Sequence, residues 1–314
     1  DLFEEMRHSG IEPNDVTYLS IIKACTNMIS LDHGKRIHNY IKSSNSKMVT
    51  SVGNALIDMY IKCGSLTDAH DVFEKLTQRS VVTWSTLIAG DVEHGFCEEA
   101  LLHFRDMQKE GFVVSNITIA YVLKACSVIC ALDLAKLVHA YSIEISLVSD
   151  VLVANTLVYM YIKCGSFEDA CNTFNDSLDL DVVTWSAMIA GCSNYQQAIH
   201  YFKSMLSSGI RPNDVTFIGL LSACCQAGCV NEGCHHFKSM TLDYNIVASA
   251  EHYNCMVDLL ARSGFLVEAK MMLLTMPFDP DIKVWTSLLS HSKVLGEASL
   301  GKRCFDTVTI ADVV

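Results

Sequence analysis

The sequence contains no Cys-x-x-Cys pair, although fourteen of its 314 residues are cysteine. Many zinc sites and dithiol redox sites depend on such closely spaced thiols, so neither is predicted. Instead, Cys25 and Cys126, and likewise Cys63 and Cys164, recur at one fixed spacing along the chain. A cysteine that recurs at equivalent positions of stacked units is typically a small buried apolar residue. We therefore expect buried, free thiols in a reducing compartment, and no bound metal ion.

The sequence signatures of catalysis are also missing. The chain has no glycine-rich phosphate loop, no nucleophile elbow and no His-x-Glu motif. His94, His139 and His252, for example, are not followed two residues later by glutamate. The longest stretch without Asp, Glu, Lys or Arg, residues 182–202, is interrupted by several polar side chains, which excludes a convincing membrane span. We therefore predict no enzymatic activity, no cofactor and no membrane partner.

What the sequence does contain is a long internal repeat. Tyr60–Ser65 returns as Tyr161–Ser166, an offset of 101 residues, and Val81–Ser85 returns at the same offset. Aligned without gaps, residues 50–90 and 151–191 are identical at about half of their positions. A period of this length is too large for one supersecondary unit, so it should subdivide.

The period divides into units of about 35, 31 and 35 residues. The units span 1–14 (the second half of a repeat), 15–49, 50–80, 81–115, 116–150, 151–181, 182–213, 214–249, 250–281 and 282–314. The unit 182–213 is shortened, and the missing residues are expected near Asn194, at the turn between two helices. Because the chain begins within a repeat, we interpret it as a fragment of a longer protein.

Each unit has the pattern of two amphipathic helices. In the unit that starts at Val81, Trp84, Leu87 and Ile88 form one apolar stripe, and residues 100–107 carry a second. Gly95 separates the two predicted helices. No alternating strand pattern is present. Neither helix could bury its stripe alone, so the sequence predicts an all-α solenoid of stacked helical hairpins.

Basic side chains are scarce, with 23 Lys and Arg against 35 Asp and Glu, a net charge of −12. This balance is unfavourable for nucleic-acid binding, which needs cations at the phosphates. However, Lys62, Lys163 and Arg262 each occupy the thirteenth position of a unit. They either complement the dipole at a helix C-terminus or form a row of phosphate contacts, and both interpretations can hold together.

These features resemble the pentatricopeptide repeat family, in particular the plant type that alternates P, L and S repeats. The resemblance is carried by Asn54–Ser65 with Asp68–Ala69 (S), Val81–Ser85 with Phe104–Met107 (P), Thr216–Gly228 (L), Glu251–Leu260 (last S), and Val284–Leu289 with Leu300–Arg303 (E motif). It implies a right-handed superhelical solenoid of helix-turn-helix repeats. It also implies P repeats at 1–14, 81–115 and 182–213, L repeats at 15–49, 116–150 and 214–249, S repeats at 50–80, 151–181 and 250–281, and a truncated E-like motif at 282–314.

The resemblance implies a function in RNA recognition. Family members of this type are organellar proteins that bind single-stranded RNA and specify sites of C-to-U editing. The zinc deaminase that some of them carry has His-x-Glu and Cys-x-x-Cys motifs, both absent here. We therefore expect a protein of the mitochondrion or chloroplast that recognises a site, with a deaminase-bearing or other editing factor supplied in trans.

The resemblance also implies which residues recognise bases: the fifth and the last residue of each repeat. The pairs and their expected bases are Asn54 with Ser80 (a pyrimidine), Ser85 with Ser115 (ambiguous), Asn155 with Asp181 (U), Ser186 with Asn213 (A) and Asn254 with Asp281 (U). The L repeats should discriminate weakly. Val82 and Val183, at the second position, are expected to sandwich the bases. The simpler alternative is that these polar residues only cap helices.

Two rival hypotheses remain open at this point. A tetratricopeptide-type scaffold for protein partners would share the helical hairpins, but its period is a constant 34 residues. An organellar RNA-stability or splicing factor would use the same repeats with a different outcome.

Overall fold

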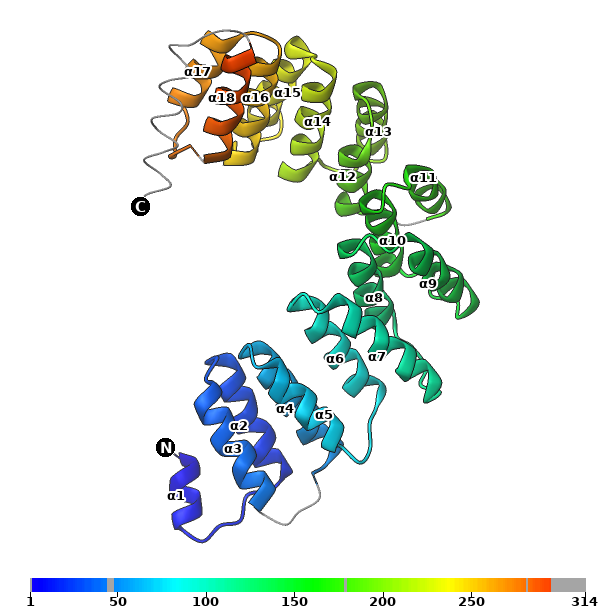
Figure 1. Ribbon diagram of the computed structural model, residues 1–314, viewed down its shortest axis with the longest axis vertical. Helices are drawn as coiled ribbons and strands as arrows, with labels where there is room; N and C mark the ends of the chain where they lie inside the picture. The colour runs from blue at the N-terminus through cyan, green and yellow to red at the C-terminus, as the bar shows by residue number, and fades with distance from the viewer. Residues whose placement is uncertain (1, 44–47, 178–179, 281, 295–314) are drawn as a thin grey trace. The chain divides into compact units, whose positions relative to one another are not determined.

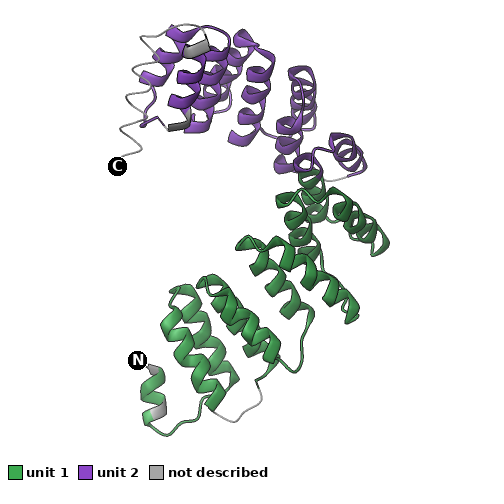
Figure 2. Ribbon diagram, in the orientation of Figure 1, with its two compact units in different colours: residues 1–160 green, residues 161–314 purple. Residues whose placement is uncertain are grey.

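The computed structural model describes residues 2–43, 48–177, 180–280 and 282–294. Within these ranges the chain forms α-helices and no strand (Figure 1). The helices divide between two compact units, residues 1–160 and 161–314, each of which is described by itself (Figure 2). Among the described residues, no helix combines the length and the apolar character needed to cross a membrane.

Among its described residues, the first unit holds nine helices and the start of a tenth. They are α1 (Leu2–His8), α2 (Asp15–Asn27), α3 (Leu31–Ser43), α4 (Thr50–Lys62), α5 (Leu66–Lys75), α6 (Val81–Glu93), α7 (Cys97–Lys109), α8 (Asn116–Val128) and α9 (Leu132–Glu144), followed by α10 (Val151–Lys163), which leads into the second unit. The second unit then holds α11 (Phe167–Asp176), α12 (Val182–Gly191), α13 (Tyr195–Ser207), α14 (Asp214–Ala227), α15 (Val230–Leu242), α16 (Ala250–Arg262), α17 (Leu266–Leu274) and α18 (Ile282–Val294).

Within each unit the helices pair into hairpins, and the hairpins stack. In the first unit α2 packs against α3 and α4, α4 against α5 and α6, and α6 against α7 and α8. In the second unit α12, α14, α16 and α18 form the corresponding row. The first helix of each hairpin therefore rests on the first helix of the next. This arrangement confirms the predicted all-helical tandem-repeat solenoid.

Helix boundaries follow local sequence signals. The first helices start at Asp15, Thr50, Val81, Asn116, Val151, Val182, Asp214, Ala250 and Ile282, which are also the first residues of the sequence units. At the end of α6, Gly95 takes the left-handed conformation with φ 84°, which only glycine adopts without strain. The Phe96 and Gly95 amides then donate to Asp91 O at 2.8 Å and Val92 O at 3.2 Å, which closes the helix.

The shortened repeat differs from the prediction in where it is shortened. The sequence placed the missing residues at the turn near Asn194, but α12 has 10 residues where α6 has 13. The connection after each helix is equally long. The chain leaves α12 in an extended conformation at Cys192, without a left-handed glycine, and Asn194 caps α13 by accepting from the Gln197 amide. The first helix, rather than the turn, absorbs the deletion.

Burial follows the predicted stripes. Trp84, Leu87 and Ile88 are buried on α6, as are Phe104 and Met107 on α7. Small residues allow the closest approaches between helices. At Gly219 of α14 an added Cβ would lie 3.0 Å from the backbone nitrogen of Ala190 in α12, so the backbones of these two helices are in close contact.

The cysteine prediction holds for one pair and is wrong for the other. Cys25 and Cys126 are buried among the stacked helices. Cys63 and Cys164 are only half-buried. They directly follow Lys62 and Lys163, the last residues of α4 and α10, so they lie at helix ends rather than within the stacked helices.

One buried polar pair links neighbouring hairpins in the first unit. His38 of α3 lies 2.8 Å from the Tyr60 hydroxyl of α4 (Nδ1 to Oη), and both side chains are buried. Burial is the main cause that lowers the pKa of His38 to about 4 and raises the pKa of Tyr60 to about 12. His38 is thus neutral in the folded chain throughout the mildly acidic range.

This pair predicts a specific loss of stability in acid. Above pH 6.5, His38 is neutral in both the folded and the unfolded chain, so it contributes no pH dependence. Between pH 6.5 and about 4 the unfolded chain binds a proton that the folded chain excludes, which costs up to about 3 kcal/mol of unfolding free energy. His38→Gln retains a hydrogen-bonding partner for Tyr60 but cannot titrate. Urea unfolding at pH 7 and pH 4.5 should show a smaller loss for the variant, and parallel losses would contradict the assignment.

Candidate nucleic-acid interface

The predicted base-recognition residues lie where consecutive first helices meet. The last residue of one repeat is the N-cap of the next first helix, as Ser80 is for α6, Ser115 for α8 and Asn213 for α14. The fifth residue of the repeat lies one turn into the preceding first helix. Because first helices pack side by side, the fold brings the two positions together.

In the 50–80 repeat the pair is joined through a third side chain. The Thr83 hydroxyl donates to Asn54 Oδ1 at 2.7 Å, and Asn54 Nδ2 lies 3.5 Å from Ser80 Oγ. Ser80 in turn accepts from the Thr83 amide at 3.2 Å and caps α6. Thr83 is fully buried and belongs to the following repeat, at its third position.

The same three-residue arrangement recurs in the second unit. Ser186 Oγ lies 3.2 Å from Asn213 Oδ1 and 2.7 Å from Thr216 Oγ1. Asn213 Oδ1 also accepts from the Thr216 amide and hydroxyl, both at 2.9 Å. Ser186 is itself buried, with 1 % of its surface exposed, whereas Asn213 is half-buried.

A third example is found in the 81–115 repeat. Ser85 Oγ lies 2.6 Å from Thr118 Oγ1, and Ser115 Oγ accepts from the Thr118 amide at 3.2 Å. The sequence analysis missed this threonine. Its signal was present, since threonine occupies the third position at Thr17, Thr83, Thr118, Thr184 and Thr216. We call each set of fifth residue, last residue and following threonine a junction triad.

The cap fixes the orientation of the last side chain. The Thr216 amide needs an acceptor, so the carboxamide oxygen of Asn213 faces the helix, and Nδ2 is the atom left for a ligand. At Asp181 one oxygen, Oδ1, accepts from the Val183 amide and from the Thr184 amide and hydroxyl, each at 3.0 Å. Oδ2 of Asp181 is left as an acceptor. Capping therefore uses one side of each group and leaves the other.

The remaining predicted pairs are less complete. Asn155 lies on α10 in the first unit, whereas Asp181 is the N-cap of α12 in the second. Asn254 Oδ1 is buried and has no hydrogen-bond partner among the described residues. The third position of the following repeat is Val284, which lacks the hydroxyl that serves the other triads. Asp281, the partner expected for Asn254, lies outside the described residues.

An L repeat shows why recognition should be weak there. Ala120, its fifth residue, has no hydrogen-bonding side chain. Asp150, its last residue, caps α10 through Oδ1, and its Oδ2 accepts from Asn116 Nδ2 at 2.9 Å. Both carboxylate oxygens of Asp150 are therefore engaged within the protein.

Exposed aliphatic side chains flank these caps. Val82 and Val183 are 59 % and 58 % exposed. Each lies two residues after the N-cap of its helix, Ser80 for α6 and Asp181 for α12. The second position is an exposed aliphatic residue in further repeats that the sequence analysis did not single out: Val16, Ile117, Leu152 and Val215. Each could present a flat apolar contact to one face of a base.

The three recurring cations lie at the C-terminal ends of first helices. Lys62, Lys163 and Arg262 are the last residues of α4, α10 and α16. Lys62 pairs with Asp58 at 3.0 Å and Arg262 with Asp258 at 3.3 Å. Such exposed pairs contribute only about 0–1 kcal/mol, so these cations can exchange a carboxylate for a phosphate. The helix-end position is thus observed, and it is compatible with phosphate binding.

Comparison with protein-family models gives repeat matches along the chain. The PPR repeat model matches residues 54–81, 82–112, 215–243 and 251–278. The PPR repeat family model matches residues 180–226, and the pentatricopeptide repeat domain model matches residues 1–28.

Curated relatives from Arabidopsis thaliana match almost the whole chain. A putative pentatricopeptide repeat-containing protein is 38 % identical over 301 residues, which cover 95 % of this chain and 40 % of the relative. A chloroplastic one is 36 % identical over 304 residues (95 % and 41 %), and a mitochondrial one is 32 % identical over 336 residues (96 % and 49 %). The chain thus spans less than half the length of these three relatives.

Solved structures match in fold. The crystal structure of the pentatricopeptide repeat protein PPR10 in complex with an 18-nucleotide psaJ RNA element superposes with a TM-score of 0.84 at 19 % identity, covering 99 % of this chain and 47 % of that one. PPR10 from maize gives 0.74 at 18 % identity, covering 98 % and 45 %. The repeat matches, the relatives and the stacked helical hairpins agree, and the chain belongs to the pentatricopeptide repeat family.

Proposed function

We propose that this chain binds single-stranded RNA in a sequence-specific manner, with one base at each repeat. The observation that carries the proposal is the junction triad, which holds one hydrogen-bonding atom of the last residue in place beside an exposed aliphatic side chain. The fold match to a protein solved with an RNA element supports the same conclusion. The cations at the ends of α4, α10 and α16 would meet the phosphates.

The chemistry of the last residue accounts for the expected base preferences. Asn213 offers the donor Nδ2, which complements the acceptor N1 of adenine on its Watson–Crick edge. Asp181 offers the acceptor Oδ2, which complements the N3–H donor of uracil. Ser80 and Ser115 carry hydroxyls, which donate as well as accept, so we expect weaker discrimination there.

The fifth residue has a different part in this scheme when it is buried. Ser186 is too enclosed to share its hydroxyl with a large ligand, and it holds Asn213 instead. Asn54 is half-buried and can contribute a direct contact. With the N-terminal repeat at the 5′ side, the proposed core is 5′-pyrimidine-N-N-U-A-N-U-3′, with Asn155, Asp181, Asn254 and Asp281 specifying the two uridines.

We further propose that the parent protein is a site-recognition factor for C-to-U editing in a mitochondrion or chloroplast. The order of P, L and S repeats and the E-like segment at 282–314 support this proposal, and relatives named as chloroplastic and mitochondrial favour an organelle. A deaminase-bearing or other editing factor would act in trans.

The central prediction concerns Asn213→Asp. The change keeps the cap on α14 but replaces the outward donor by an acceptor, so the preferred fifth base of the core should change from A to G, whose N1–H is a donor. The variant should bind the A-containing RNA about tenfold more weakly and the G-containing RNA about tenfold more tightly than the original chain. A matched hydrogen bond contributes about 1–3 kcal/mol over an unmatched one. Fluorescence anisotropy with two RNAs that differ only at that base measures it.

Gln196→Glu is a suitable control because it adds the same charge on an exposed position of α13. It should weaken both RNAs equally. If Asn213→Asp leaves the order of the two RNAs unchanged while circular dichroism shows an intact fold, the base assignment is wrong.

A second prediction tests the triad through a residue that no base can reach. Thr216→Val removes the hydroxyl that donates to Asn213 and contacts Ser186, yet it preserves shape at a fully buried site. We expect a loss of about 1–3 kcal/mol of stability and a reduced A-over-G preference. Thr17→Val removes the equivalent hydroxyl, which donates to the N-cap Asn14 of α2, in a repeat outside the proposed core. It should reduce stability and leave the preference intact; an equal loss of preference in both variants would contradict the triad.

The third prediction is that the chain does not deaminate RNA by itself. Incubation with RNA that carries the core and a downstream cytidine should yield no uridine, with or without added zinc, because the glutamate proton shuttle of the zinc deaminases has no counterpart motif. Zinc-dependent formation of uridine would overturn the assignment of the deaminase to a partner.

A further inference from the structure

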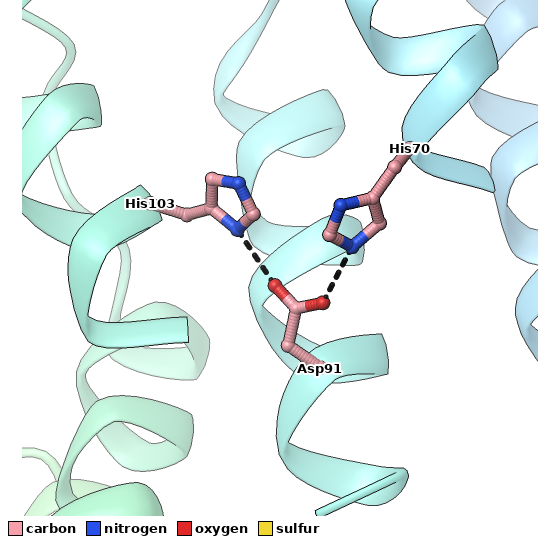
Figure 3. A group of neighbouring side chains, drawn as sticks. All are labelled: His70, Asp91 and His103. Carbon is pink, nitrogen blue, oxygen red and sulfur yellow. Dashed lines mark hydrogen bonds and ion pairs between the residues drawn. The ribbon is translucent and has the colours of Figure 1, made fainter. Parts of the chain in front are cut away.

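Three helices of the first unit bring two histidines to one buried aspartate. His70 of α5 and His103 of α7 approach Asp91 of α6 from opposite sides, and both imidazoles point at its carboxylate (Figure 3). His70 Nε2 lies 2.8 Å from Oδ1, and His103 Nδ1 lies 2.7 Å from Oδ2. One atom from each of the three side chains lies within 4.8 Å of the others.

The burial of this cluster is uneven. The Asp91 side chain is 0 % exposed, whereas those of His70 and His103 are 33 % and 20 % exposed. Burial raises the pKa of Asp91, but the hydrogen bonds from His103 and His70 outweigh it and leave the pKa below its ordinary value. Glu74 and Glu99 lie close enough to His70 to add negative charge around the cluster. The cluster favours a cation that enters from the side of the imidazoles.

Packing holds the ligand atoms in place. The His103 ring lies 6.0 Å from Phe73 and 6.3 Å from Trp84, centroid to centroid, and 5.2 Å from His70. Rigid side chains that converge on a partly open point are the usual basis of a metal site. Ligands around a tetrahedral zinc ion are separated by about 3.3 Å, given bonds of about 2.0–2.1 Å. The two His–Asp91 separations, 2.8 and 2.7 Å, would need to widen by about half an ångström to admit an ion.

The second unit shows that the fold does not require these charges. At the positions equivalent to His70, Asp91 and His103, allowing for the shortened repeat, stand Cys171, Cys192 and Tyr201. Cys171 Sγ lies 3.3 Å from Tyr201 Oη, and burial raises the pKa of Cys192 to about 12, so this junction is held by neutral groups. Among the described residues, His70, Asp91 and His103 form the one group of His, Cys, Asp or Glu side chains that could hold a metal ion.

We propose that His70, Asp91 and His103 bind one divalent transition-metal ion, with Zn²⁺ as the natural candidate. Two imidazoles and a carboxylate are the donors that Zn²⁺, Co²⁺ and Ni²⁺ accept, and the exposed side leaves the fourth position to water. Both imidazoles bind as neutral ligands, so any proton held between His and Asp91 is released on binding. The sequence analysis predicted no metal because the three ligands lie on different helices and form no motif.

The ion would tie two neighbouring repeats together. His70 belongs to the 50–80 repeat, while Asp91 and His103 belong to the 81–115 repeat. The first helices of these repeats, α4 and α6, carry Asn54 and Ser85 of the candidate interface. Occupancy would therefore fix the spacing of two adjacent base-recognition positions without contacting RNA.

Cobalt titration of the full chain tests the site. The chain is stripped with a chelator, kept reduced with a phosphine and titrated with Co²⁺, whose visible d–d bands report a tetrahedral site. One equivalent should bind without the charge-transfer bands of thiolate ligation. His70→Gln and His103→Gln should each weaken Co²⁺ binding by about 100-fold or more. Loss of a residue that only hydrogen-bonds to a metal ligand typically weakens binding by about 10- to 100-fold. Zn²⁺ should raise the Tm of the original chain and not that of the variants.

His94→Gln is the matched control, since His94 is an exposed histidine at the C-cap of α6, the helix that carries Asp91, and its Nδ1 lies 2.9 Å from the Gly90 carbonyl oxygen. It should bind Co²⁺ like the original chain. Circular dichroism and Tm without metal verify the fold, and if His103→Gln unfolds, the more exposed His70→Gln decides. Equal Co²⁺ affinity in the original chain and His70→Gln, or binding through thiolates alone, would overturn the proposal.

Discussion

The packing of each first helix on the first helix of the next repeat is the contact on which the rest of this protein depends. A single hairpin exposes an apolar stripe that it cannot bury, and α4, for example, packs not only on α5 of its own hairpin but also on α2 and α6 of the neighbouring repeats. The same contact sets the candidate interface, because it places the fifth residue of one helix beside the N-cap of the next. Stability and the proposed recognition therefore depend on one geometry, and a residue such as Thr216, buried between two first helices, would serve both.

Capping does not exclude the proposed recognition role of these residues. A backbone amide at the start of a helix needs an acceptor, and Asn213 and Asp181 each supply one oxygen for it. Each group has a second polar atom that the cap does not use, and the cap determines which atom that is. An asparagine held in this way offers a donor and an aspartate offers an acceptor, so a helix cap would distinguish bases in the function proposed here. At Asp150 the second oxygen already accepts a hydrogen bond from Asn116, so this aspartate does not offer a second atom to a base.

The repeats are alike in backbone and differ in what fills their junctions. The threonine at the third position completes the triads of Asn54, Ser85 and Ser186, whereas Val284 leaves Asn254 Oδ1 without a partner among the described residues. The junction of α5, α6 and α7 holds His70, Asp91 and His103, whereas its counterpart holds two cysteines and a tyrosine. Because each repeat contacts only its neighbours, such substitutions change one junction and leave the others intact. A repeat array can in this way acquire a local site without altering its architecture.

The sequence by itself determined the features that depend on neighbouring residues. The unit starts, the all-helical fold, the apolar stripes of α6 and the glycine turn at Gly95 all follow from spacing within a few turns of chain. Only the tertiary structure decided what depends on separate helices meeting. It showed that α12 absorbs the deletion, that Cys63 and Cys164 are only half-buried at helix ends, that Ser186 is buried, and that a threonine joins three of the candidate pairs. It also brought His70, Asp91 and His103 together. Their ligand atoms come from three helices, and no spacing along the chain records which helix faces lie against one another.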